Sequence, residues 1–131
     1  IITSGIDPKC VTIGHCSDSD SSEYVKKLAK KGCFIGMDRI FFYADEEFLR
    51  KKALLLAELA VAGYENQILL SHDALVFSGF NDMPYVNPDQ PFKTIFEKFI
   101  PILHERGFTK KDIDNFLINN PQRMFLGAFY G

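Results

Sequence analysis

Three short apolar runs, at residues 10–15, 33–39 and 67–73, are the feature that most limits how this chain can fold. Between them lie two segments with the spacing of amphipathic helices, at residues 23–31 and 45–62. Short apolar runs bounded by glycine and polar residues are typical of buried strands. A strand–helix–strand order requires parallel pairing through a right-handed crossover. The sequence therefore predicts an α/β fold, and because three strands cannot close a barrel, we expect them to form part of a larger sheet or barrel.

Capping signals mark the ends of both predicted helices. The serine- and aspartate-rich segment 17–22 offers side-chain acceptors for the free N–H groups at the start of the first helix. The second helix begins at Asp45, with acidic residues in its first turn, where the helix dipole favours negative charge. Gly32 and Gly63 are the predicted ends of the two helices.

The last third of the chain predicts further helices. Residues 92–106 form a helical pattern that Pro101 should kink or break. Thr109 and Asp112 have the spacing of a capping box, with Asp in the place of Glu, at the start of a helix that reaches Asn119. After that residue we expect only a short terminal turn.

Composition excludes several function classes. The chain has 131 residues and a formal net charge of −2, with 15 basic against 17 acidic residues. Nucleic-acid binding needs clustered positive charge, so we expect no nucleic-acid partner. No run approaches the roughly 20 apolar residues of a membrane span, so we expect no membrane association. The three cysteines are an odd number without the CxxC spacing, which favours a reduced, cytoplasmic compartment over a disulfide framework.

All three predicted strands finish in ionisable residues: His15 with Asp18, Asp38 with Arg39, and His72 with Asp73. In parallel α/β folds the carboxyl ends of the strands carry the active site, because the loops that follow are free to vary. Neighbouring strands lie about 4.8 Å apart, so groups at adjacent ends can converge on one ligand. An imidazole suits zinc and similar divalent ions, and the Asp73 carboxylate could bind a metal, orient water or accept a proton.

Each of these residues also has a structural interpretation. Asp18 is placed to act as a helix N-cap. Asp38 and Arg39 could form a salt bridge that holds the rim of the sheet together. Side chains alternate along a strand, so His72 and Asp73 cannot both point into the same interior, and His72 is typical of a structural histidine.

Four stretches in chain order resemble the phosphotriesterase family of metal-dependent hydrolases, within the amidohydrolase superfamily. They are IGHCSDSD at residues 13–20, GCFIGMDR at 32–39, LSHD at 70–73 and DIDNFLINNPQRMF at 112–125. The Asp-Arg pair, where other members have Asp-His, is closest to the phosphotriesterase-like lactonases. The resemblance implies that residues 1–131 are the C-terminal portion of a TIM-type (β/α)8 barrel, namely strands six to eight with their helices, with no complete domain boundary inside the chain.

The same resemblance implies a pair of divalent metal ions at the mouth of the barrel, zinc first, with manganese, cobalt and iron as alternatives. By this likeness His15 is the metal ligand on strand six, and Asp73 binds metal on strand eight and takes a proton from the bridging hydroxide. Asp18 and Arg39 then surround Asp73, and Arg39 also faces substrate. The loop at residues 74–91 shapes the substrate pocket, and its aromatic residues are the expected apolar wall: Phe77, Phe80 and Tyr85.

The implied function is hydrolysis of a lactone or ester, with a phosphotriester as a further candidate. Most ligands of a two-metal site are absent from these residues, so we expect activity only with the remaining N-terminal part of the barrel and inactivity of the fragment alone. A homodimer is the expected assembly. The alternative is a non-catalytic remnant or binding module that retains the half-barrel.

Overall fold

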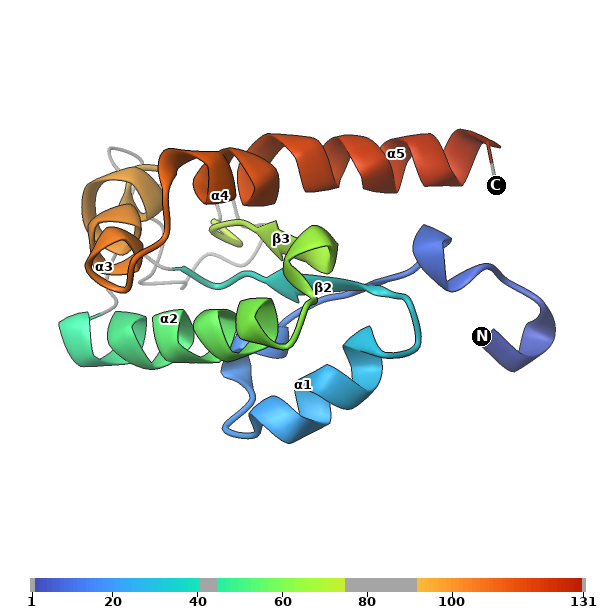
Figure 1. Cartoon of the computed structure of the whole chain (residues 1–131), viewed down its shortest axis with the longest axis horizontal. Coiled ribbons are helices and arrows are strands. Elements are labelled where there is room, and N and C mark those ends of the chain that lie inside the picture. Colours follow the sequence, from blue (N-terminus) through green and yellow to red (C-terminus); the bar gives the residue numbers. More distant parts are fainter. Residues whose placement is uncertain (1, 41–44, 75–91, 131) are drawn as a thin grey trace, which may run out of the picture.

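A three-stranded parallel sheet forms the centre of the computed structural model, which describes residues 2–40, 45–74 and 92–130. The strands are β1 (Thr12–Ile13), β2 (Phe34–Met37) and β3 (Ile68–Leu70), and their order in the sheet follows their order in the chain (Figure 1). Register pairs Ile35 with both Ile13 and Ile68. The predicted α/β order with parallel pairing is therefore confirmed.

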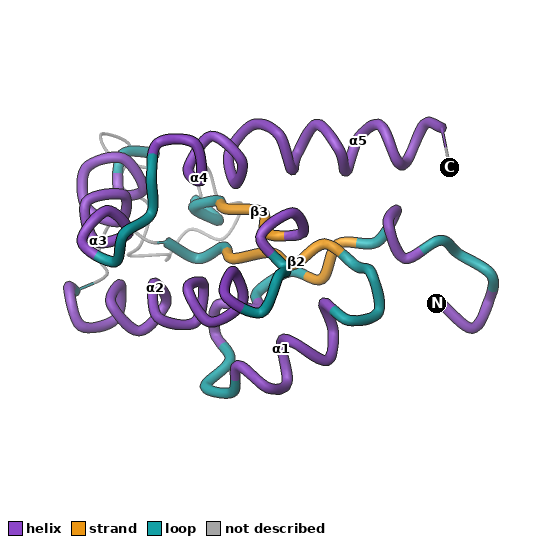
Figure 2. The backbone as a smooth tube through the Cα atoms, in the orientation of Figure 1, coloured by secondary structure: helices purple, strands orange, loops and turns teal. Residues whose placement is uncertain are grey.

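Two helices connect the strands. Helix α1 (Ser22–Ala29) lies between β1 and β2, and the longer α2 (Glu46–Val61) lies between β2 and β3. Both run on the same side of the sheet in Figures 1 and 2, as right-handed crossovers require. Their apolar faces and the strands share one core, which includes Ile35 and Met37 of β2, because helices and neighbouring strands enclose this central strand.

The capping residues begin and end these helices as the sequence predicts. The hydroxyl of Ser21 accepts the N–H of Tyr24 at the start of α1, and the carboxylate of Asp45 accepts the N–H of Phe48 at the start of α2. Gly32 and Gly63 follow the helix ends with φ angles of 91° and 87°. A side chain at this left-handed φ would strain the backbone, which is why glycine ends both helices.

The C-terminal third is helical, and it differs from the prediction in one respect. A π-helical turn, η5 (Ile95–Phe99), leads directly into α3 (Ile100–Glu105), and Pro101 lies in the first turn of α3. The predicted kink or break therefore takes the form of a change from π-helical to α-helical turns just before Pro101, and the helix is not interrupted there. The capping box of Thr109 and Asp112 is formed at the start of α4 (Lys110–Asp114), which continues through a second π-helical turn, η6 (Asn115–Asn119).

The expected short terminal turn after Asn119 is wrong, because α5 (Asn120–Tyr130) is an eleven-residue helix. The reason is the π-helical turn that precedes Pro121: the N–H of Asn120 donates to the carbonyl of Asn115, five residues back. The wider turn accommodates a proline that lacks an N–H and would crowd the carbonyl of a regular α-helix. The helix therefore continues past the proline and packs on β3 (Figure 2).

Short 3-10 turns complete the fold: η1 (Ile2–Ser4), η2 (Pro8–Cys10), η3 (Cys16–Asp18) and η4 (Glu65–Gln67). Among the described residues, no helix has both the length and the apolar character that crossing a membrane requires. The predicted loop at 74–91, apart from Ala74, lies outside the described residues, and so do Phe77, Phe80 and Tyr85.

Candidate functional site

The backbone turns sharply just beyond the end of every strand. Three non-glycine residues in the described chain have a positive φ: His15 at 58°, Arg39 at 60° and Asp73 at 51°. They follow β1, β2 and β3 respectively. A left-handed conformation costs an L-residue about 1–2 kcal/mol, and such residues concentrate at functional sites. The strand ends that the sequence singles out are therefore also the places where the backbone is strained.

His15 is held by the carboxylate of Asp38. The backbone N–H of His15 donates to Oδ2 of Asp38 at 3.0 Å, and the ring Nδ1 lies 3.1 Å from Oδ1. Gly36 makes this approach possible, since a Cβ there would lie 3.1 Å from the Asp38 carboxylate and from the backbone of Gly14. The geometry assigns the proton to Nδ1, which leaves Nε2 as the free electron-pair donor of His15.

His15 and Asp73 lie close together although they follow the two outer strands. The ring Nδ1 of His15 is 3.9 Å from Oδ2 of Asp73, across the end of β2. Both side chains are about half-exposed, so they are open to a ligand from outside the described residues. The structure thus brings together the two residues that the sequence proposes as metal ligands.

Arg39 joins two carboxylates from different strand ends. Its Nε donates to Oδ2 of Asp73 at 3.3 Å, and its Nη1 donates to Oδ2 of Asp18 at 2.6 Å. The two carboxylates raise the pKa of Arg39, chiefly through the hydrogen bond to Asp18, so the guanidinium stays charged. Arg39 therefore contacts Asp73 directly, and Asp18 lies on the other side of Arg39.

Two structural interpretations of these residues are wrong. Asp18 does not cap α1, because Ser21 occupies that position and the Asp18 carboxylate points instead to Arg39. Asp38 and Arg39 bond to partners on other strand ends rather than to each other. In both cases the tertiary neighbours, which lie 21 or more residues away in sequence, outcompete the local partner.

His72, by contrast, is a structural residue in this fold. It is buried, and its Nε2 accepts the backbone N–H of Ile95 at 3.0 Å, which fixes the start of η5. Burial lowers the pKa of His72 and so favours the neutral ring that this hydrogen bond requires. The side chain of His72 is buried and that of Asp73 is exposed, as the alternation of side chains along an extended chain predicts.

Cys16 lies beside His15 and is not a thiolate. Burial, with a smaller contribution from the charge of Asp38, raises the pKa of the Cys16 thiol to about 11. Its Sγ donates to the carbonyl of Ile13 at 3.3 Å. The thiol of Cys16 is therefore protonated at neutral pH, which argues against a nucleophilic role.

Lys52 is the residue that sequence reasoning missed. It lies on α2, is 3% exposed, and its Nζ donates to Oδ1 of Asp18 at 3.0 Å and to the carbonyl of Ser17 at 3.1 Å. The spacing of apolar residues could have identified it: Lys52 is three residues after Leu49 and four before Leu56, on the buried face of the helix. A lysine at such a position is normally paired.

The charge of Asp18 is set by its two cationic partners. Burial raises the pKa of this carboxyl, but the hydrogen bonds from Lys52 and Arg39, together with their positive charges, more than offset burial and lower it below its ordinary value. Asp18 is therefore ionised and links α2 to the end of β2.

A metal centre would need ligands from elsewhere. The described residues contain no cluster of three or more His, Cys, Asp or Glu side chains that could hold a metal ion. Nevertheless the donor types fit: an imidazole with a free Nε2 and a carboxylate suit zinc and several other divalent ions. His15 and Asp73 thus have the side-chain types that commonly bind divalent metal ions.

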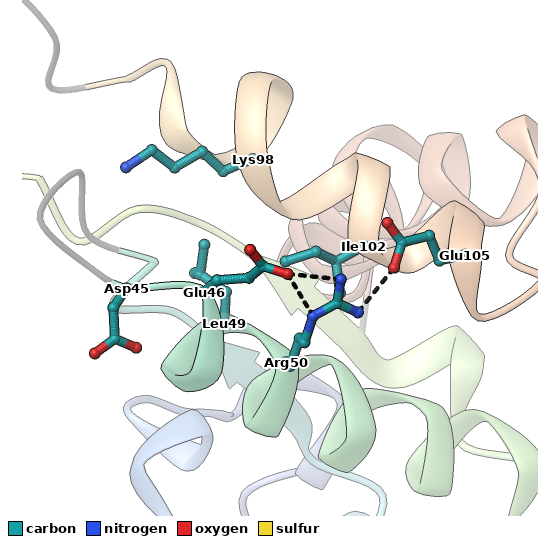
Figure 3. A pocket seen from close by; sticks show the side chains of 7 residues that line it. All are labelled: Asp45, Glu46, Leu49, Arg50, Lys98, Ile102 and Glu105. Carbon is teal, nitrogen blue, oxygen red and sulfur yellow. Dashed lines mark hydrogen bonds and ion pairs between the residues drawn. The ribbon is translucent and has the colours of Figure 1, made fainter.

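A separate hollow of about 410 Å³ lies between α2 and the η5–α3 helix, and none of the strand-end residues described above lines it (Figure 3). Arg50 spans it and pairs with Glu46 at 2.7 Å and with Glu105 at 2.8 Å. The guanidinium of Arg50 is thus held by two carboxylates from the wall of the hollow itself. The strand ends remain the candidate site.

This chain has relatives among known proteins. Residues 1–125 match the model of the phosphotriesterase family. The chain is 34% identical over 128 residues to an aryldialkylphosphatase of Saccharolobus solfataricus, covering 92% of this chain and 40% of that protein. It is 30% identical to a phospho-furanose lactonase of Mycoplasmopsis synoviae, covering 95% and 36%. This chain therefore spans about two fifths of the length of these relatives.

A solved phosphotriesterase from Mycobacterium tuberculosis has the same fold over this region. It superimposes with a TM-score of 0.78 at 28% sequence identity, covering 95% of this chain and 39% of that one. The strand order, the helices and the C-terminal α5 are thus those of one part of a larger α/β barrel. The chain belongs to the phosphotriesterase family and has the fold of the C-terminal part of its (β/α)8 barrel.

Proposed function

We propose that this chain supplies strands six to eight of a metal-dependent hydrolase that cleaves a lactone or ester, with a phosphotriester as the further candidate. The observation that carries the proposal is the meeting of His15 and Asp73 across the end of β2, with Arg39 bonded to the same Asp73 oxygen. Imidazole, carboxylate and guanidinium are the groups that such a reaction uses to hold an ion, move a proton and orient a polar substrate.

Each side chain has a defined role in this proposal. His15 would hold an ion through Nε2, oriented by Asp38, and Asp73 would bind metal and accept the proton lost by the attacking water. Arg39 would face the substrate while it fixes the orientation of Asp73, and Asp18 would hold Arg39 from behind. When bound, two divalent ions, zinc in the first instance or manganese, cobalt or iron, polarise the substrate carbonyl and lower the pKa of water.

The substrate class is supported by two kinds of observation. The relatives carry the names of an aryldialkylphosphatase and of a phospho-furanose lactonase, which are both hydrolases of polarised ester-type bonds. Arg39 lies in a half-exposed position beside Asp73, where it could contact a carbonyl or phosphoryl oxygen. We further propose that Phe77, Phe80 and Tyr85 form the apolar wall of the pocket, and that the barrel is completed by an N-terminal part and forms a homodimer in the cytoplasm.

The test is an assay of the complete polypeptide that carries this chain, loaded with zinc or manganese, against a panel of lactones and a paraoxon-like phosphotriester. We expect metal-dependent turnover of a lactone or ester, and none from residues 1–131 alone. Absence of any turnover in the metal-loaded protein would favour the binding-module alternative. An intact mass of 14.9 kDa for a folded monomer in the source would contradict the larger barrel.

A further inference from the structure

The buried lysine of α2 stands behind the proposed active site. We infer that Lys52 is a positioning residue, which holds Asp18 so that Asp18 holds Arg39 against Asp73; this inference rests on the proposed function. The side chains form one continuous row from the helix layer to the strand ends: Lys52 to Asp18 at 3.0 Å, Asp18 to Arg39 at 2.6 Å and Arg39 to Asp73 at 3.3 Å.

Lys52 is fixed by its surroundings. The ammonium group has three donor hydrogens, and it lies near three partners: Oδ1 of Asp18, the carbonyl of Ser17 and the ring of Phe48, whose centroid is 4.2 Å away. A buried charge with such partners is held in one geometry, because any movement would leave it unpaired in a low-dielectric interior. The lysine is therefore a rigid point from which Asp18 can be oriented.

Asp18 uses one oxygen for each cation. Oδ1 accepts from Lys52 and Oδ2 accepts from Arg39, so the orientation of the carboxylate is determined by both. Without Lys52 the carboxylate could rotate, and Oδ2 would no longer be directed at Arg39. Since Arg39 contributes Nε to Asp73 and Nη1 to Asp18, loss of the second contact frees the guanidinium to turn away from the first.

Lys52 also secures the segment that carries Asp18. Its bond to the carbonyl of Ser17 joins α2 to η3, and the hydroxyl of Ser17 in turn donates to the carbonyl of Asp38 at the end of β2. The neighbouring Lys51 makes no comparable contact: it is 71% exposed and pairs with Glu47 one turn earlier on its own helix. The two adjacent lysines thus form a natural pair of test and control.

The experiment compares four variants of the complete, metal-loaded protein: Lys52→Met, Lys51→Met, Asp18→Asn and the double variant Lys52→Met/Asp18→Asn. We expect kcat/KM on the lactone or ester to fall about tenfold in Lys52→Met and in Asp18→Asn, the usual effect of losing a supporting contact behind a site. Lys51→Met should match the wild type. The double variant should be no worse than Asp18→Asn alone, because Lys52 acts through Asp18.

Independent losses that multiply to about a hundredfold in the double variant would overturn the inference, and so would a folded Lys52→Met that matches Lys51→Met. The double variant removes both members of the ion pair and so leaves no unpaired buried charge between them. If Lys52→Met does not fold, the kcat/KM of Asp18→Asn can still be compared with that of the double variant, and equal values support the inference. A second fallback is Lys52→Arg, which keeps the charge and should retain more activity than Asp18→Asn.

A second measurement separates this inference from the proposed function. In protein labelled with ¹⁵N-arginine, the Nε–H signal of Arg39, assigned by its loss in Arg39→Lys, reports the contact with Asp73. We expect it to shift or broaden in Lys52→Met or in Asp18→Asn and to remain in Lys51→Met. This result requires no turnover, so an inactive protein with the expected signals contradicts only the proposed function. An active protein in which the Arg39 signal is unchanged by Lys52→Met contradicts only the positioning role.

Discussion

Different polar side chains lie at the two ends of strand β3, one accessible to solvent and the other buried. At the carboxyl end, Asp73 is half-exposed, pairs with Arg39 and has a left-handed backbone conformation. At the amino end, Asn120 of α5 is fully buried, and its amide nitrogen donates to the carbonyls of Ile68 at 2.7 Å and Glu65 at 2.8 Å. The first arrangement keeps charge accessible at the expense of backbone strain, and the second completes the hydrogen bonding of the backbone. In barrels of this class the carboxyl ends serve function and the amino ends serve stability.

Asp73→Asn should have the largest effect at the carboxyl end. An amide cannot accept the proton that the proposed reaction releases, so we expect kcat of the complete protein to fall by about 10³-fold. The melting temperature should hardly change, since the side chain is exposed. Steady-state kinetics and thermal unfolding measure the two effects, with the exposed Asp20→Asn as control. Near-normal turnover by Asp73→Asn would remove Asp73 from the mechanism.

Asn120→Ala should show the reverse at the amino end. It leaves the buried carbonyl of Ile68 without its side-chain donor, while the carbonyl of Glu65 keeps only the amide of Asn115. We expect this loss to lower the free energy of unfolding by about 2 kcal/mol. Urea unfolding measures this loss, and kcat per folded molecule should be unchanged. Asn119→Ala, at the adjacent exposed position, should fall within about 0.5 kcal/mol of the wild type. An equal effect of the two substitutions would show that the buried amide contributes nothing special.

Asp38→Asn should weaken metal binding rather than stability. Both oxygens of Asp38 face N–H groups of His15, and an amide can offer an oxygen to only one of them. We expect about a tenfold loss of metal affinity, measured by competition with a chelator, because the ring of His15 is no longer fixed. Unchanged affinity would mean that His15 is oriented by its backbone alone or binds no metal.

The smallest effect is the pH dependence that Asp18 contributes. Its partners lower its pKa in the folded state, so its stabilisation is present above the ordinary value of 3.8 and is lost as the pH falls through the lower, folded value. The difference in unfolding free energy between the wild type and Asp18→Asn should therefore shrink below about pH 4. A difference that stays constant from pH 6 to pH 3 would contradict the assigned contacts. The effect is modest because the carboxylate is partly exposed.

Much of the fold could be predicted because its signals are local. The alternation of apolar strands and amphipathic helices, the caps at Ser21 and Asp45, the capping box at Thr109 and the closing Gly63 each depend on residues within a few positions. The course of the chain after Asn119 could not be predicted in this way. A proline normally ends a helix, and only the π-helical turn before it allows α5 to form.

The sequence by itself determined the family, the strand–helix order and the identity of the charged residues at the strand ends, since spacing and residue type carry that information. Only the tertiary structure decided which of these charges meet. Asp18 could have capped a helix, Asp38 could have paired with Arg39, and Lys52 could have been a surface residue. Their partners lie 21 to 35 positions away, where no local pattern reaches, and the parallel register of the sheet brings them together.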